Sequence, residues 1–168
     1  SAKKEILGLV KRHPDVIKFS LDRSKNFKNL DLPTLKAAIS QAKAFKIPVI
    51  VHIGTWQDAE DAVNAGADVI THLDFNPLPE KLVQLMKERQ VMEIPTMTYQ
   101  IDFVNILENR SVLESPLLQK VIGPDLLSSY KKMDPKVEQV GSFAGEQAQK
   151  REGYFLNLKK MLGAGIPI

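Results

Sequence analysis

The sequence contains no cysteine among its 168 residues. Disulfides and thiolate ligands are therefore excluded, and a metal site in this chain has to use histidine, carboxylate or modified lysine side chains. Histidine is also scarce, with three in the chain, so the position of each one is informative. No apolar run approaches the roughly 20 residues that span a bilayer. The start of the chain has no long apolar segment of the kind found in signal peptides.

The charge balance is close to even and argues against a highly charged partner. The chain has 23 basic and 20 acidic residues, for a net charge of +3. The lysines are spread along helical segments instead of forming one run, so we expect solvated helix faces and no nucleic-acid or membrane partner. With 43% hydrophobic and 26% charged residues, the composition is typical of one soluble globular domain. The cellular compartment stays open, because a segment before Ser1 could be missing.

Short β-branched runs alternate with longer amphipathic runs over the first hundred residues. The predicted strands cover residues 15–21, 47–53, 67–73 and 90–98. The predicted helices between them cover residues 32–46, 55–66 and 78–90. In the first helix Phe45 continues the apolar stripe, while Thr55 or Asp58 caps the second helix and Gly66 ends it. This alternation predicts a parallel sheet covered by helices.

After Tyr99 the pattern changes to helices alone. Residues 100–163 read as several helices divided by Pro116, Pro124 and Pro135. A βα connection is normally short, so this stretch predicts a helical insertion that serves as a lid or faces substrate. The final residues, 166–168, repeat the Ile-Pro pattern that opens the strand at 47–53 and predict the start of a fifth strand.

The predicted fold class is α/β, as part of a (β/α)8 TIM-type barrel with a helical insertion. A closed barrel of this kind takes about 250 residues, whereas this chain supplies four strands and the start of a fifth. An open sheet leaves unpaired backbone at its edges. We therefore expect residues 1–168 to form a single partial barrel domain that the rest of a larger protein, or another chain, completes.

Two of the three histidines occupy equivalent places in this pattern. His52 lies near the end of the predicted strand 47–53, and His72 lies near the end of 67–73. Functional groups collect at the carboxyl ends of parallel strands, and imidazoles from consecutive strands would converge on one point, as metal ligands do. A lone histidine there would more simply bond to backbone, but equal placement of two favours ligands. His13 is expected at the surface.

Lys18 and two aspartates accompany the histidines. Lys18 lies inside the strand at 15–21, where an ammonium group is costly to bury. Exposure at a sheet edge is the plain interpretation, and a carbamylated lysine that offers two oxygen ligands is the functional one. Asp22 and Asp74 follow their strands and could orient the imidazoles, although capping of turns is the favoured interpretation for both.

Four segments together resemble a known family. In order they are "IK", "VHIGTWQDAEDAVNAGADVITHL", "IPTM" and "LGAGIPI", and their order resembles the C-terminal half of the metal-dependent amidohydrolase superfamily, particularly its imidazolonepropionase-like and Xaa-Pro-dipeptidase-like branch. The resemblance implies barrel strands four to seven and the start of strand eight. It also implies that Lys18, carboxylated, bridges two divalent ions, that His52 and His72 bind the second ion, and that Tyr99 faces substrate.

By this resemblance the chain is part of a hydrolase for amide or related C–N bonds, of the dipeptidase, prolidase or cyclic-amidase kind. The cofactor would be one or two divalent ions, with zinc the first choice, and the substrate a dipeptide or other small molecule. The family's His-x-His of strand one and its Thr-Asp after strand eight have no counterpart in these residues. No catalytic residue is therefore assigned, and we expect the 168-residue chain to be inactive by itself.

Two other functions stay open. The segment "NAGADVI" also resembles helix-to-strand junctions of phosphate-binding aldolase or isomerase barrels. Those enzymes would need a glycine-rich loop at a helix N-terminus near strands seven and eight, and the sequence shows none. The third possibility is a half-barrel without catalytic activity that assembles with a copy of itself or with another chain.

Overall fold

The computed structural model describes residues 2–24, 28–134 and 136–168, apart from the side chains of Tyr99, Gln100, Phe103 and Gln139. The chain divides into two compact units. We call Ser1–Pro95 with Gly153–Ile168 the sheet unit, and Thr96–Glu152 the helical unit. No helix in the described part of the chain is long and apolar enough to span a membrane.

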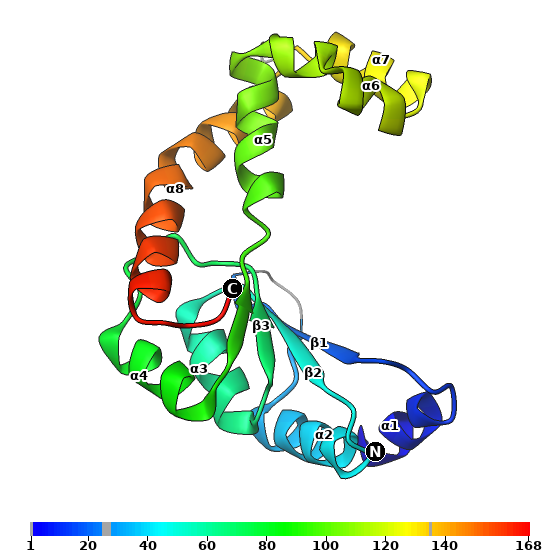
Figure 1. The fold of residues 1–168 in the computed structure, drawn as a ribbon, viewed down its shortest axis with the longest axis vertical. Helices are drawn as coiled ribbons and strands as arrows, with labels where there is room; N and C mark the ends of the chain where they lie inside the picture. Colours follow the sequence, from blue (N-terminus) through cyan, green and yellow to red (C-terminus); the bar gives the residue numbers. More distant parts are fainter. Residues whose placement is uncertain (1, 25–27, 135) are drawn as a thin grey trace. The chain divides into compact units, whose positions relative to one another are not determined.

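The sheet unit is built on four parallel strands in the order β1-β2-β3-β4 (Figure 1). Their bounds are Ile17–Leu21, Val49–Ile53, Val69–Thr71 and Met92–Ile94. The four predicted strands and the parallel sheet are thereby confirmed. The register sets Ser20 opposite His52 and His52 opposite Thr71. Residues at matching positions of successive strands therefore lie side by side across the sheet.

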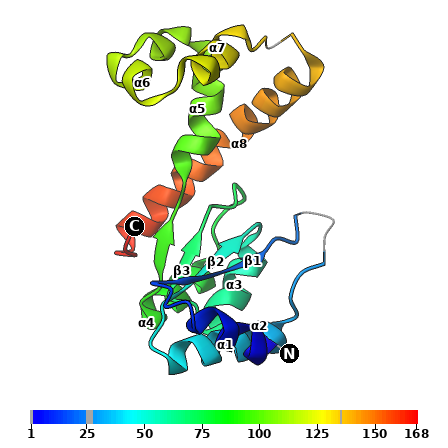
Figure 2. The ribbon, with the colours of Figure 1, turned by 90° about the vertical axis from the view of Figure 1, so that its right-hand side faces the viewer.

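Four helices accompany the sheet in this unit and leave one of its faces open. They are α1 Ala2–Val10, α2 Leu32–Ala44, α3 Trp56–Ala65 and α4 Glu80–Arg89. The helices α2, α3 and α4 contact one another in sequence order, and α1 contacts α2 (Figure 2). As predicted, Thr55 caps α3, in a capping box with Asp58, and Gly66 ends it in the left-handed region at φ 99°. The helix α1 was not predicted from the sequence.

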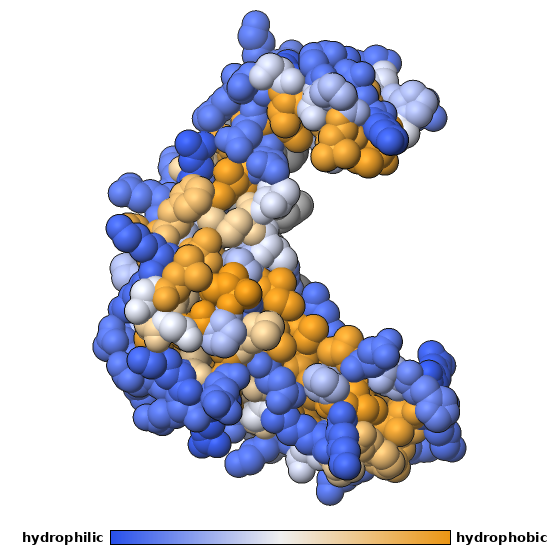
Figure 3. Space-filling model, viewed as in Figure 1, coloured by the Kyte–Doolittle hydropathy of each residue, from blue (hydrophilic) through white to orange (hydrophobic). Residues whose placement is uncertain are grey.

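The sheet has two different faces because side chains alternate along each strand. On the face toward the helices the side chains are buried: Ile17, Leu21, Val49, Val51, Ile53, Ile70 and Glu93. On the other face, which we call the open face, Lys18, Ser20, Met92 and Ile94 are exposed. The space-filling view shows hydrophobic residues reaching the surface of the sheet unit (Figure 3). The core of this unit therefore lies between the sheet and its helices.

Two details of the predicted elements are wrong. The strand predicted over 90–98 ends at Ile94, because Pro95 has no N–H to donate to a neighbouring strand and Thr96 adopts φ 47°, after which α5 begins at Met97. The segment "IPTM" therefore forms the strand end, a turn and a helix start. Phe45, expected on the buried stripe, is 45% exposed, since α2 ends at Ala44 and Phe45 is its C-cap.

The helical unit contains short elements and few buried apolar side chains. Its elements are α5 Met97–Glu108, a 3-10 helix η1 Arg110–Glu114, α6 Pro116–Val121, α7 Pro124–Lys132 and the first part of α8 Glu138–Gly163. Among its described hydrophobic side chains, Val104 and Leu113 are the buried ones. The Arg110 guanidinium donates to the backbone carbonyls of Tyr130, Lys131 and Met133 and so ties η1 to the end of α7.

The last part of α8 belongs to the sheet unit and packs on the loop after β3. The Asn157 side chain accepts from the Leu78 N–H at 2.9 Å and donates to the carbonyls of Asp74 at 2.8 Å and Asn76 at 2.7 Å. Beyond α8, the Glu93 N–H donates to the Pro167 carbonyl at 2.9 Å. Residues 166–168 are not a regular strand, but this bond brings them to the edge of β4, where the fifth strand was expected.

Candidate functional site

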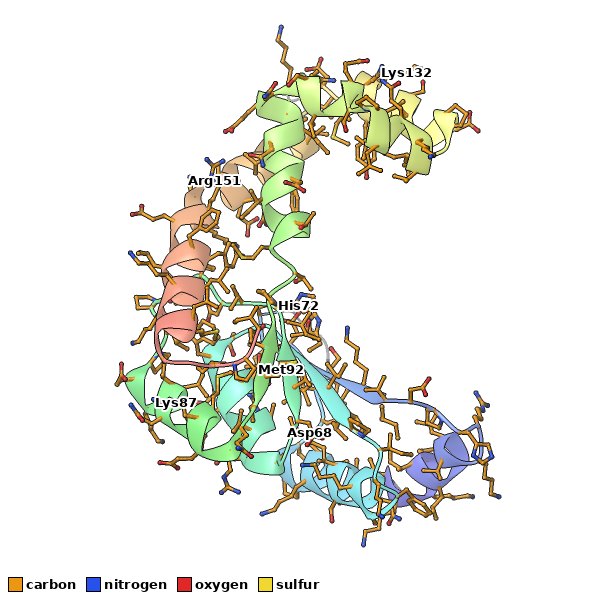
Figure 4. The ribbon with its side chains drawn as sticks, viewed as in Figure 1. Asp68, His72, Lys87, Met92, Lys132 and Arg151 are labelled. Carbon is orange, nitrogen blue, oxygen red and sulfur yellow. The ribbon has the colours of Figure 1, made fainter. Side chains whose placement is uncertain are left out.

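His52 and His72 meet at the carboxyl ends of neighbouring strands. His52 lies within β2 and His72 directly follows β3. Their ring centroids are 4.4 Å apart, with the two planes at 69° in an edge-to-face arrangement. Figure 4 shows His72 and Asp68 at opposite ends of β3. The predicted convergence of the two imidazoles is therefore present in the structure.

The backbone at His72 is in an unusual conformation. Its φ of 79° lies in the left-handed region, which few residues other than glycine adopt, although histidine does so more often than most. The His72 N–H donates to the Ile94 carbonyl at 2.9 Å, and the Thr71 hydroxyl donates to the same oxygen at 3.0 Å. These two bonds to β4 hold the turn that directs the imidazole of His72 toward that of His52.

Burial keeps His72 neutral. The pKa of His72 is lowered to about 4, chiefly by desolvation and then by charge interactions with His52 and Lys18, against the opposing effect of Asp22. The imidazole is therefore uncharged at neutral pH, which is the form that binds metal ions. The same balance shows that the charges of His52, Lys18 and Asp22 all act on His72 from nearby.

Lys18 lies on β1 and is exposed, as the plain interpretation of this residue expected. In the register of β1 and β2, Ser20 lies opposite His52. Lys18 is two residues before Ser20 and points to the same side of the sheet, so Lys18 and His52 share the open face. The structure thus brings Lys18 to the face that carries the imidazoles. Tyr99 is in α5, but its side chain lies outside the described residues, so its contact with substrate stays a prediction. His13 is exposed, as expected.

The two aspartates have different roles. Asp74 accepts from the Trp56 N–H at 3.2 Å and from the backbone and side-chain amides of Asn76 at 2.9 and 2.8 Å. It caps α3 and a turn, as the favoured interpretation held. Asp22 is 5% exposed, and its Oδ2 lies 3.5 Å from Nε2 of His52. Its Oδ1 accepts from the Ser24 N–H at 3.1 Å, so Asp22 also caps a turn, as the favoured interpretation held. In addition Asp22 faces an imidazole, which was the other interpretation of this residue.

The donor set agrees with part of a metal site. The described residues contain no group of three or more histidine, cysteine, aspartate or glutamate side chains that could hold a metal ion. An imidazole bound to zinc has its ring centre about 3 Å from the ion, so two ligands of one tetrahedral ion have centres about 5 Å apart. The 4.4 Å between His52 and His72 is slightly shorter than that spacing.

Sequence reasoning missed two residues near this sheet. Gly54 follows β2, and a Cβ there would lie 1.9 Å from Oδ1 of Asp22, so only glycine leaves room for that carboxylate. Glu93 is in the middle of β4, fully buried on the helix-facing side. An acidic residue in the middle of a strand expected to be buried was the signal for Glu93. No local pattern singles out Gly54.

Comparison of the sequence with protein-family models and with curated proteins found no match. Solved structures, in contrast, match almost the whole chain. Ochratoxinase from A. niger matches with a TM-score of 0.64 at 18% identity over 99% of this chain and 33% of its own. A Xaa-Pro dipeptidase with methionine bound in its active site also matches at 0.64 and 18%, over 99% and 36%. Both belong to the amidohydrolase superfamily.

This chain shares its fold with part of those two amidohydrolases. An uncharacterized protein matches almost as well, with a TM-score of 0.63 at 14% identity over 99% of this chain and 36% of that one. The chain therefore spans about a third of the length of the structures it matches. The likeness to these structures lies in the arrangement of the elements in space.

Proposed function

We propose that this chain is part of a metal-dependent hydrolase that cleaves amide or related C–N bonds. The observation that carries the proposal is the 4.4 Å approach of His52 and His72 at the carboxyl ends of adjacent parallel strands. Lys18 lies on the same face and its charge acts on His72. The fold shared with ochratoxinase and a Xaa-Pro dipeptidase supports the same class of enzyme.

The proposed ligands are His52 and His72 to one divalent ion and a carboxylated Lys18 bridging to a second, with zinc as the first choice. A bound zinc ion would lower the pKa of a coordinated water to about 7 and polarise the substrate carbonyl. The residues of this chain supply a neutral imidazole at His72, at the rim of the sheet, and an exposed amine at Lys18 that carbon dioxide can reach.

In this proposal β1 to β4 are strands four to seven of a barrel, and residues 166–168 begin strand eight. The bond from the Glu93 N–H to the Pro167 carbonyl supports a fifth strand next to β4. The remaining barrel would cover the open face, where Met92 and Ile94 are 42% and 39% exposed, and would supply the other metal ligands. Without them the 168 residues would be inactive.

The proposed substrate is a dipeptide, including those with proline, or a cyclic amide. The helical unit would serve as the substrate-facing region that follows strand seven, with Tyr99 at its start. Its position directly after β4 in the chain supports this assignment, because loops after the carboxyl ends of strands carry specificity in such barrels.

A metal titration tests the ligand assignment. Protein without a histidine tag is titrated with Zn²⁺ from micromolar to millimolar concentrations, and the imidazole resonances of all three histidines are followed by NMR. We expect the resonances of His52 and His72 to shift together and the affinity to fall at least tenfold in His52→Ala and in His72→Ala. His13→Ala is the matched control, because His13 is exposed and remote from the strand ends, and should leave binding intact. Unchanged stoichiometry in both site variants would refute the assignment.

The modification of Lys18 has its own test. In ¹³C-labelled bicarbonate with Zn²⁺ present, a carbamate resonance should form that disappears in Lys18→Ala and persists in Lys36→Ala, which removes an exposed lysine from α2. A carbamate signal of equal intensity in both variants would remove Lys18 from the ligand set.

The exposed apolar residues of the open face also favour a second candidate, a half-barrel that pairs with another copy. Sedimentation velocity at several concentrations distinguishes the two. Reversible self-association that Met92→Lys abolishes would support pairing over this face. A monomer at all concentrations would leave the remainder of a longer barrel as the covering element.

A further inference from the structure

The carboxylate of Asp22 is nearly buried and hydrogen-bonded next to His52. Its Oδ1 accepts from the backbone N–H of Ser24 at 3.1 Å and from the Ser24 hydroxyl. Its other oxygen, Oδ2, lies 3.5 Å from Nε2 of His52. The side chain of Asp22 is 7% exposed, whereas that of His52 is 30% exposed. One oxygen of the carboxylate is thus anchored and the other is presented to the imidazole.

Two further residues fix the position of Asp22 and its carboxylate. The Asn29 side chain accepts from the Asp22 N–H at 2.7 Å and donates to the Asp22 carbonyl at 3.2 Å, which clamps the backbone of Asp22. Gly54, two residues after His52, lies against the carboxylate, so a Cβ at Gly54 would come within 1.9 Å of Oδ1 and 2.6 Å of Cγ. The strand that carries the imidazole therefore also shapes the space for its partner.

The neighbouring cation does not neutralise Asp22. Arg23 directs its guanidinium to α3, with Nη1 2.6 Å from Asp58 and Nη2 2.7 Å from Asp61. Among the described residues, the ion-pair partner that the geometry assigns to Asp22 is His52. A buried carboxylate beside an imidazole favours the ring orientation that brings an N–H to it.

We propose that Asp22 is the positioning residue of His52, holding the proton on Nε2 so that Nδ1 presents its lone pair at the strand ends. The 3.5 Å separation is longer than a hydrogen bond, so the proposed contact requires the imidazole and the carboxylate to come closer. The part of this inference that concerns a metal rests on the proposed function. The orientation of the ring does not, because Asp22 and Gly54 act on the imidazole whether or not an ion is bound.

The first experiment uses the metal-free protein. The ¹⁵N resonances of the His52 imidazole report which nitrogen carries the proton, and the exchange of that proton with water reports whether it is bonded. We expect a proton on Nε2 with slowed exchange in the wild type, and fast exchange in Asp22→Asn and Gly54→Ala. Asp22→Asn is nearly isosteric, and Gly54→Ala keeps the carboxylate but displaces it. Asp74→Asn is the control, since Asp74 is also a buried aspartate after a strand but binds backbone and amide donors.

The second experiment measures Zn²⁺ affinity. Removal of an outer partner of a ligating histidine typically costs 10- to 100-fold in metal affinity, so Asp22→Asn should weaken binding by that factor. In a His52→Ala background the same change should have no further effect, because Asp22 acts through His52.

The two experiments fail in different ways. A proton on Nδ1 of His52 in the wild type, or exchange that Asp22→Asn and Gly54→Ala leave unchanged, would overturn the positioning role. An equal affinity loss from Asp22→Asn with and without His52 would also overturn it. Slowed exchange that depends on Asp22, in a protein that does not bind Zn²⁺ through His52 and His72, would support the positioning role and refute the proposed function.

Discussion

The helix-facing side of the sheet and its carboxyl rim each hold a titratable side chain that burial keeps neutral at pH 7, with opposite consequences. On the helix-facing side Glu93 is fully buried, and desolvation raises its pKa to about 9. At the carboxyl rim of the sheet, desolvation lowers the pKa of His72 to about 4. One group is an acid that keeps its proton, and the other is a base that lacks one.

The difference lies in depth and in neighbours. Neither carboxyl oxygen of Glu93 has a hydrogen-bond partner among the described residues, so the group lowers stability in the dry interior. His72 is half-buried and contacts His52. Its imidazole therefore loses less hydration than the carboxyl group of Glu93 and stays accessible to a ligand. The comparison indicates that partial burial at a strand end suits a binding group, and that complete burial does not.

The largest expected contrast is between adjacent residues of β3. Ile70 is fully buried toward the helices, whereas Val69 is half-buried on the other face. Ile70→Ala should lower the free energy of unfolding by about 3 to 4 kcal/mol, because it leaves a cavity in the core. Val69→Ala should cost about 1 kcal/mol or less. Urea denaturation measures both, and equal losses would contradict the two-face description.

Glu93 should make stability fall as pH rises. Its pKa is about 9 in the folded chain against an ordinary value of 4.5, so between these values the unfolded chain releases a proton that the folded chain keeps. The loss approaches about 1 kcal/mol per pH unit. Denaturation from pH 5 to pH 8 should show this slope in the wild type and a flatter one in Glu93→Gln. Parallel slopes would show that Glu93 is partnered or ionised in the folded protein.

His72 should act in the opposite direction. Its pKa falls from 6.5 to about 4 on folding, so its contribution to stability is present above pH 6.5 and is lost as pH falls toward 4. Because the ring is half-exposed, solvent screening limits the effect to about 1 kcal/mol. His72→Asn, which tolerates the left-handed backbone, should flatten the acid side of the stability curve. An NMR titration in which His72 protonates near pH 6.5 would contradict this prediction.

Lys18 should show the smallest effect. Its side chain is exposed on the open face, so Lys18→Ala should change the free energy of unfolding by about 0.5 kcal/mol or less. The same variant should remove the carbamate signal described above. A large stability loss would mean that Lys18 is part of the core and not of the site.

The elements of the sheet unit were largely predictable from sequence, since hydrophobic periodicity and caps such as Thr55 and Gly66 are local signals. The end of the strand predicted over 90–98 could not be predicted, because the turn at Thr96 has a left-handed backbone conformation that a threonine side chain does not indicate. The burial of Glu93 was not predicted, because the composition of a strand does not show how deeply each side chain is buried. The position of the Asp22 carboxylate depends on Gly54, which is distant in sequence.

The sequence by itself determined most of the strands and helices of the sheet unit, and that two histidines and a lysine lie on or directly after consecutive strands. Only the tertiary structure decided that His52 and His72, separated by 20 positions, stand 4.4 Å apart, and that Asp22 rather than Asp74 faces an imidazole. The physical reason is that periodicity is a property of neighbours along the chain. The register of parallel strands, and the depth of each side chain, arise from hydrogen bonds and packing between segments that are remote in sequence.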